Sequence, residues 1–160
     1  FSASGCGGSA GAQSIPEATL LGGHAEDLTP FQSGWIFFRS GNLSTGQEPF
    51  FSDGTAGNTY MLADINAGTG SSTCDSIRFS KQSVSSGGFV YFFADDGING
   101  CEVWRTDGTP EGTAMLVDSI VGPGGFLFTH GIVASGKNLF VSGQITEDPD
   151  TYEFYVINLD

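Results

Sequence analysis

DGTPEGTAML, residues 107–116, decides the fold, because an earlier stretch of the chain repeats it. Residues 53–62 read DGTAGNTYML and align with it without a gap, at an offset of 54 residues. A decayed third copy follows before residue 160. The runs that flank the motif repeat as well: Ile36–Phe38 with Val90–Phe92 and Leu139–Val141, and Glu48–Phe51 with Glu102–Arg105 and Glu153–Tyr155. Self-similarity at a fixed period indicates a repeat architecture.

Each repeat predicts short β-strands. Trp35–Arg39, Phe89–Phe93 and Asn138–Ser142 are apolar and aromatic runs bounded by Gly and Ser, too short for helices and rich in residues that favour strands. The Asp-Gly pairs of the first two copies lie between two such runs, which favours a hairpin because Gly tolerates positive φ. No window repeats at 3.6 residues, so we expect almost no helix.

Four short antiparallel strands in each unit of about 50 residues are typical of a β-propeller blade. We therefore predict an all-β fold of repeated four-stranded antiparallel sheets, β-propeller-like, with about three blades. The repeat domain spans 18–160, with units at roughly 24–65, 66–120 and 121–160 and an orphan fourth strand at 18–22. A Gly, Ser and Ala-rich segment at 1–17 is expected to be flexible.

Three blades are fewer than the four to eight of known propellers. The last unit also lacks a fourth strand, and the orphan strand is expected to pair beside it or with a neighbouring molecule. Open flanks would expose apolar sheet faces. We therefore expect the chain to work as a homo-oligomer or as part of a larger complex.

The stretch GCEVWRTDGT at 100–109, flanked by VYFFA at 90–94 and GTAMLVD at 112–118, resembles the ELWxxDGT repeat of extracytoplasmic proteins. The first unit departs from the pattern with Glu48-Pro49-Phe50, and the last keeps Glu153-Phe154-Tyr155 but lacks Asp-Gly-Thr. The resemblance implies a β-propeller-like architecture and a secreted, cell-surface or organellar-lumen location. It brings no catalytic residues with it.

Charge excludes two classes of partner. The chain carries 18 Asp and Glu against 5 Lys and Arg, a formal charge of −13, which disfavours nucleic acid and anionic membrane surfaces. Hydrophobic residues make up 39% of the chain and include 14 Phe, enough to bury a core. We expect protein subunits, self-association or glycans as partners.

Aromatic residues at repeat positions are the candidates for ligand binding. Trp35, Trp104 and Tyr155 would stack on sugar rings if exposed, whereas strand alternation favours core packing for Trp104. Asn42-Leu43-Ser44 is an N-glycosylation sequon in a predicted loop, which makes Asn42 a candidate for modification.

Acidic residues near the middle repeat are the candidates for metal binding. Asp95, Asp96, Asn99 and Glu102 offer oxygen ligands that suit calcium, although a plain acidic Gly-rich turn explains them as well. No other cofactor is expected. A hydrolase would need two of Asp95, Asp96, Asp148 and Asp150 to converge. Glu48, Glu102 and Glu153 recur at one repeat position, which favours a structural role.

Three cysteines allow three pairings, and strand order favours Cys74 with Cys101. In a four-stranded meander, the connection entering the first strand and the turn between the second and third strands lie at the same end. The first and third strands are about 9.6 Å apart, beyond the ~7 Å limit between Cα atoms, but Cys74 lies in a loop that can lean inward. Two reduced buried thiols remain the alternative. Cys6 would then be free, lipidated or bonded elsewhere.

These observations lead to an expected function. The chain is best explained as a non-enzymatic, extracytoplasmic scaffold or protein-interaction module. A carbohydrate-binding module is the alternative, and a hydrolase using loop carboxylates is a remote one.

Overall fold

The protein folds as three antiparallel β-sheets in a computed structural model, which describes residues 25–74, 82–119, 124–126, 128–144 and 152–160. The first sheet contains β1 (Glu26–Pro30), β2 (Ile36–Asn42), β3 (Gly46–Ser52) and β4 (Thr59–Met61) in that order. Two single-turn 3₁₀ helices, η1 (Gln32–Gly34) and η2 (Ala56–Asn58), interrupt its connections.

The second sheet has the same order, with β5 (Ser83–Ser86), β6 (Phe89–Asp95), β7 (Cys101–Thr106) and β8 (Ala114–Val117). The third contains β9 (Phe128–Ser135), β10 (Asn138–Gln144) and β11 (Glu153–Asn158), with β10 in the middle. All strand pairs are antiparallel, as the repeat arithmetic predicts.

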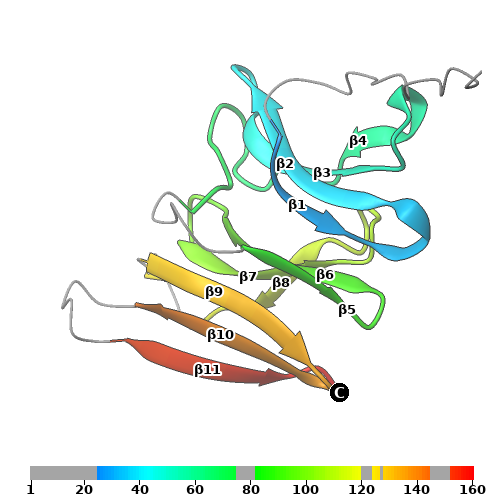
Figure 1. Ribbon diagram of the computed structural model, residues 1–160. Coiled ribbons are helices and arrows are strands. Elements are labelled where there is room, and N and C mark those ends of the chain that lie inside the picture. The colour runs from blue at the N-terminus through cyan, green and yellow to red at the C-terminus, as the bar shows by residue number, and fades with distance from the viewer. Residues whose placement is uncertain (1–24, 75–81, 120–123, 127, 145–151) are drawn as a thin grey trace, which may run out of the picture.

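The sheets stack face to face in chain order, with the second sheet between the other two (Figure 1). Phe37, Phe51 and Leu62 of the first unit pack against Val90 and Phe92 of the second sheet. On its opposite face the second sheet packs against Ile132, Leu139 and Val141 of the third. The strand alternation places apolar side chains on both faces of the second sheet, which is why β6 reads as a continuous apolar run.

The predicted all-β fold with antiparallel sheets is confirmed, and the described residues contain almost no helix. They hold sheets of four, four and three strands and form no closed ring. The segment at 1–17 and the orphan strand at 18–22 lie outside the described residues.

Candidate functional site

The Asp-Gly-Thr turns of the first two sheets have the same internal hydrogen bonds. The Asp53 carboxylate accepts from the backbone N–H of Thr55 at 2.9 Å, and Asp107 accepts from that of Thr109 at 2.9 Å. Gly108 has a φ of +94°, and a Cβ there would lie 2.7 Å from the Phe51 ring. The turn therefore requires glycine both for its backbone conformation and for contact with the first sheet.

These hydrogen bonds define a pH dependence. Bonds from the Thr109 hydroxyl and N–H hold the pKa of Asp107 below its ordinary value of 3.8. A carboxyl with a lowered pKa contributes stability above its unfolded pKa and loses it as the pH falls through the folded value. We expect Asp107→Asn to be less stable than the native chain at pH 6 and equally stable near pH 2, measured by urea unfolding. A difference that does not change with pH would contradict this assignment.

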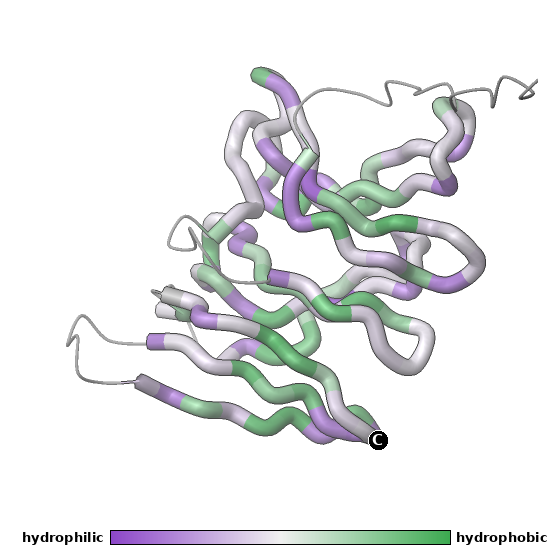
Figure 2. The backbone as a smooth tube through the Cα atoms, in the orientation of Figure 1, coloured by the Kyte–Doolittle hydropathy of each residue, from purple (hydrophilic) through white to green (hydrophobic). Residues whose placement is uncertain are grey.

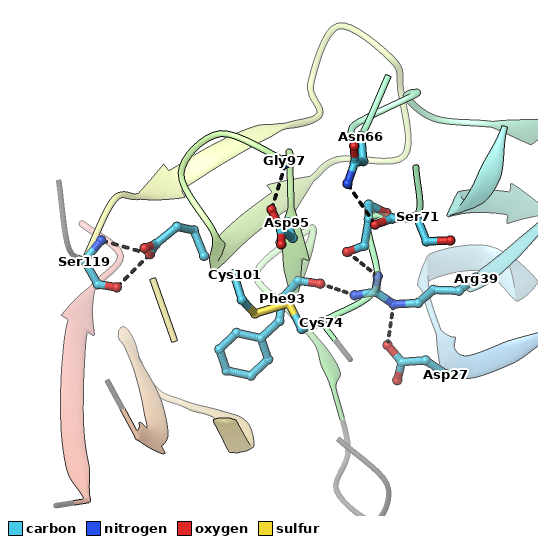
Figure 3. The surroundings of a disulfide bond; sticks show 12 residues. Asp27, Arg39, Asn66, Ser71, Cys74, Phe93, Asp95, Gly97, Cys101 and Ser119 are labelled. Carbon is cyan, nitrogen blue, oxygen red and sulfur yellow. Dashed lines mark hydrogen bonds and ion pairs between the residues drawn. A yellow bond between two sulfur atoms is a disulfide. The ribbon is translucent and has the colours of Figure 1, made fainter. Parts of the chain in front are cut away.

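Glu48 of the first sheet and Glu102 of the second each accept hydrogen bonds from the backbone of the connection that follows their sheet. Glu48 accepts from the backbone N–H groups of Ile65 and Ser72 at 3.0 and 3.2 Å. Glu102 accepts from Ser119 N–H at 2.9 Å, one repeat further on (Figure 3). Both carboxylates are fully buried. Burial raises the pKa of Glu48, against the lowering effect of its hydrogen bonds.

We expect Glu48→Gln to lower the free energy of unfolding by about 1–3 kcal/mol, because the new amide presents N–H groups to N–H donors. Urea denaturation at pH 7 measures this. Glu111→Gln, an exposed carboxylate of the second Asp-Gly-Thr turn, is the matched control. Equal losses in the two variants would contradict the structural role of Glu48.

A buried ion pair joins β1 and β2 of the first sheet at its interface with the second sheet. Arg39 is 1% exposed, and its Nε lies 3.7 Å from Oδ2 of Asp27. The guanidinium also donates to the carbonyl oxygens of Ser72, at 3.3 Å, and of Phe93 (Figure 3). Asp27 reaches this position through a bulge in β1, where its φ is +51°. Burial raises the pKa of Asp27 and lowers that of Arg39, and the opposite charge of each counters the shift of the other.

The disulfide predicted between Cys74 and Cys101 is present, with the Cα atoms 5.6 Å apart. It joins the connection between the first and second sheets to the start of β7 (Figure 3). Both cysteines are buried at the interface with the third sheet, in the cluster that contains Phe126. The loop that contains Cys74 leans toward the second sheet, as expected. The backbone N–H of Asp95 in that sheet donates to the carbonyl oxygen of Ser72 in the loop at 3.0 Å.

The predicted ligand-binding aromatics lie mainly inside the stack. Trp35 stacks on Phe51 at 5.6 Å between ring centroids, and Trp104 packs against the cluster between the first two sheets. Tyr155 borders an apolar pocket of about 370 Å³ between the second and third sheets, which Val103, Val117 and Ile157 also line. Trp35 and Trp104 thus pack against the same cluster, and Tyr155 alone among the three borders this pocket.

The predicted calcium ligands are engaged in turn hydrogen bonds. Asp96 accepts from Ile98 N–H and Asn99 N–H at 2.9 and 2.8 Å, and Asp95 accepts from Gly97 N–H. Glu102 is directed to Ser119 instead. Within the described ranges, no three His, Cys, Asp or Glu side chains form a group that suits a metal ion. Asp148 and Asp150 of the hydrolase hypothesis lie outside those ranges.

Asn42 ends β2 in an exposed hairpin, where its side-chain oxygen accepts from Ser44 N–H at 2.8 Å. Leu43 beside it is 99% exposed. The sequon therefore lies on the surface, as the sequence predicts.

An apolar sheet face is the feature that residue-by-residue motif analysis does not identify. Alternate residues of β9, β10 and β11 point away from the second sheet, and the register places Val133 and Val156 on either side of Phe140. Val133, Phe154 and Val156 are 60%, 67% and 55% exposed. Phe154 stacks on Phe140 at 5.9 Å. We call Val133, Phe140, Phe154 and Val156 the open face, and Figure 2 shows the hydrophobic stretches of these strands.

The open face carries no charge, although the chain has 18 acidic residues. Strand alternation in the third repeat is the signal that could have located it, because Phe140 and Phe154 correspond to Tyr91 and Val103, which are apolar and buried in the second sheet. Val156 corresponds to Arg105, which is exposed. Large uncovered apolar patches mark interaction sites in folded proteins.

Comparison of the chain with protein-family models, with curated proteins and with solved structures gives no match. Among the described residues, no helix is long and apolar enough to cross a membrane.

Proposed function

We propose that the chain is an extracytoplasmic β-repeat module, propeller-like in arrangement, that acts as a scaffold or protein-interaction element within a larger assembly and carries out no reaction itself. The open face carries this proposal. A face of four apolar side chains without a charge is costly to leave in water, so it favours a permanent protein contact.

The polar residues of the repeat support a scaffold role. Glu48, Glu102, Asp53 and Asp107 all accept hydrogen bonds from the backbone of their own unit. Repeated polar residues thus serve the fold. The Cys74–Cys101 disulfide supports an oxidising, extracytoplasmic compartment, where such bonds persist.

A photo-crosslinking experiment tests the proposal in cells of the source organism. The photoreactive residue p-benzoylphenylalanine replaces Phe154 on the open face or, as a control, Leu43 in the exposed hairpin. We expect covalent protein adducts from position 154 and none from position 43. Absence of adducts at position 154 would overturn a protein-contact role for this face.

A carbohydrate-binding module is the second candidate, and the position of Tyr155 beside the pocket favours it. A glycan array distinguishes the two. Binding of a glycan that Tyr155→Ala abolishes, with the Phe154 crosslinks absent, would favour this candidate over the scaffold.

A further inference from the structure

The two outer faces of the stack are equivalent to faces that are already paired inside it. In the second sheet, Val84, Tyr91 and Val103 face the third sheet. The strand registers place Val133, Phe140 and Phe154 at the same positions of the third sheet, where they form most of the open face. Three of the four open-face residues therefore occupy positions that contact a neighbouring sheet in the second unit, while Val156 occupies the position of the exposed Arg105.

Part of the surface that the open face would receive also exists in this chain, where Ile36 and Leu28 are exposed but Phe38 is already buried. Val90, Phe92 and Trp104 of the second sheet pack against the first sheet. Their equivalents in the first sheet, at the offset of 54 residues, are Ile36, Phe38 and Phe50, which lie on the face turned away from the second sheet. Phe38 and Phe50 contact each other there at 5.7 Å.

This outer face of the first sheet presents apolar side chains at its margin. Ile36 is 38% exposed, and Leu28 of the neighbouring strand is 61% exposed. The first and third sheets lie at opposite ends of the stack, with the second sheet between them (Figure 1). A chain therefore cannot place its own first sheet on its own open face.

We propose that the open face of one chain docks on the outer face of the first sheet of a second copy, and that two such contacts close a head-to-tail dimer. The contact repeats the stacking that already joins sheets within the chain. The described residues of two copies supply six β-sheets, which falls within the four to eight of closed propellers. The proposal rests on the interaction role proposed above and names its partner.

Charge sets the conditions under which the dimer forms. Each copy carries a formal charge of −13, so two copies repel each other at long range. The residues named for the two contacting faces are all uncharged. Salt screens long-range repulsion without weakening apolar burial. We expect the dimer dissociation constant to fall several-fold between about 20 mM and 300 mM NaCl.

Sedimentation velocity of the purified 160-residue chain tests the proposal with three matched variants. Phe154→Glu alters the open face, Leu28→Glu alters the first-sheet face, and Leu43→Glu adds the same charge at the exposed hairpin. All three positions are exposed, and circular dichroism checks that the variants remain folded. The native chain and Leu43→Glu should form dimers, and the other two should associate at least about tenfold more weakly, because one buried charge at each contact is uncompensated.

Mixing distinguishes a head-to-tail dimer from other arrangements. A pair of one Phe154→Glu chain and one Leu28→Glu chain retains one unaltered contact, so the mixture should contain more dimer than either variant alone. A native monomer at about 100 µM, growth beyond two copies, or dimers of Leu28→Glu as stable as native ones would each overturn the proposal. If the chain is monomeric while position 154 still crosslinks to a different protein, the dimer fails and the interaction role stands. If neither occurs, both fail.

Discussion

Replacing Arg39 with Met is expected to lower the free energy of unfolding by about 3–5 kcal/mol, because removing one partner of a buried ion pair leaves the other uncompensated. Asp27 would then be buried beside no cation, and the carbonyl oxygens of Ser72 and Phe93 would each lose a donor. The measurement is urea or guanidinium denaturation at pH 7, followed by tryptophan fluorescence. Trp35 packs against the cluster between the first two sheets and reports on the affected interface.

Arg105→Met is the matched control for this prediction. Arg105 is exposed and lies 5.0 Å from the centre of the Phe89 ring, so its removal should cost less than about 1 kcal/mol. Asp27→Asn combined with Arg39→Met should recover part of the loss, since it removes the isolated charge. If Arg39→Met and Arg105→Met were equally stable, neither the ion pair nor the hydrogen bonds of Arg39 to Ser72 and Phe93 would stabilise the fold.

Replacing both Cys74 and Cys101 with Ser is expected to cost about 3.5 kcal/mol, because the disulfide encloses 27 residues and restricts the unfolded chain accordingly. Thermal and urea unfolding of the double variant measure the loss. The same loss should follow when the native chain is unfolded with a reducing agent. The double variant itself should be insensitive to that agent, which separates the effect of the bond from the effect of the new hydroxyl groups.

Peptide mapping checks the bond directly. Trypsin cleaves after Arg39, Arg78, Lys81 and Arg105, so the unreduced protein should yield peptide 40–78 joined to peptide 82–105. Cys6→Ser should leave this product and the stability unchanged. Recovery of both peptides with alkylated thiols, without prior reduction, would contradict the bridge.

Local sequence patterns were sufficient to predict the strands, because the pattern of each strand occurs in more than one repeat unit. The 53–62 and 107–116 segments form the same turn, with the Ser52 and Thr59 hydroxyls 2.7 Å apart and those of Thr106 and Thr113 2.8 Å apart. The disulfide was predictable for the same reason, since strand order fixes which ends of a meander meet. The third unit was also recognised as three-stranded from its decayed motif.

The bulge and the ion pair were not predictable, because they depend on the irregular pairing of β1 with β2 and on the burial of Arg39 against the second sheet. Arg39 stands where the second unit has Phe93, so the repeat pattern indicates an apolar position there. A single sequence gives no sign that Asp27, twelve residues earlier, adopts a positive φ and reaches it. The sequence predicts an exposed apolar flank and strand alternation indicates its residues, but only the register of β9, β10 and β11 places these residues side by side.

The hydrogen bond from Arg39 to the carbonyl oxygen of Phe93 joins two equivalent positions of the repeat, which has a consequence for how this array can evolve. Repeat arrays commonly gain or lose whole units by duplication, because each unit contacts only its neighbours. If a copy of the second unit replaced the first unit, Phe would stand at the position of Arg39. The carbonyl oxygens of Ser72 and Phe93 would then lose their cationic donor. The residues at the contact between the first two units therefore fix the order of these units, which cannot be exchanged without loss of stability.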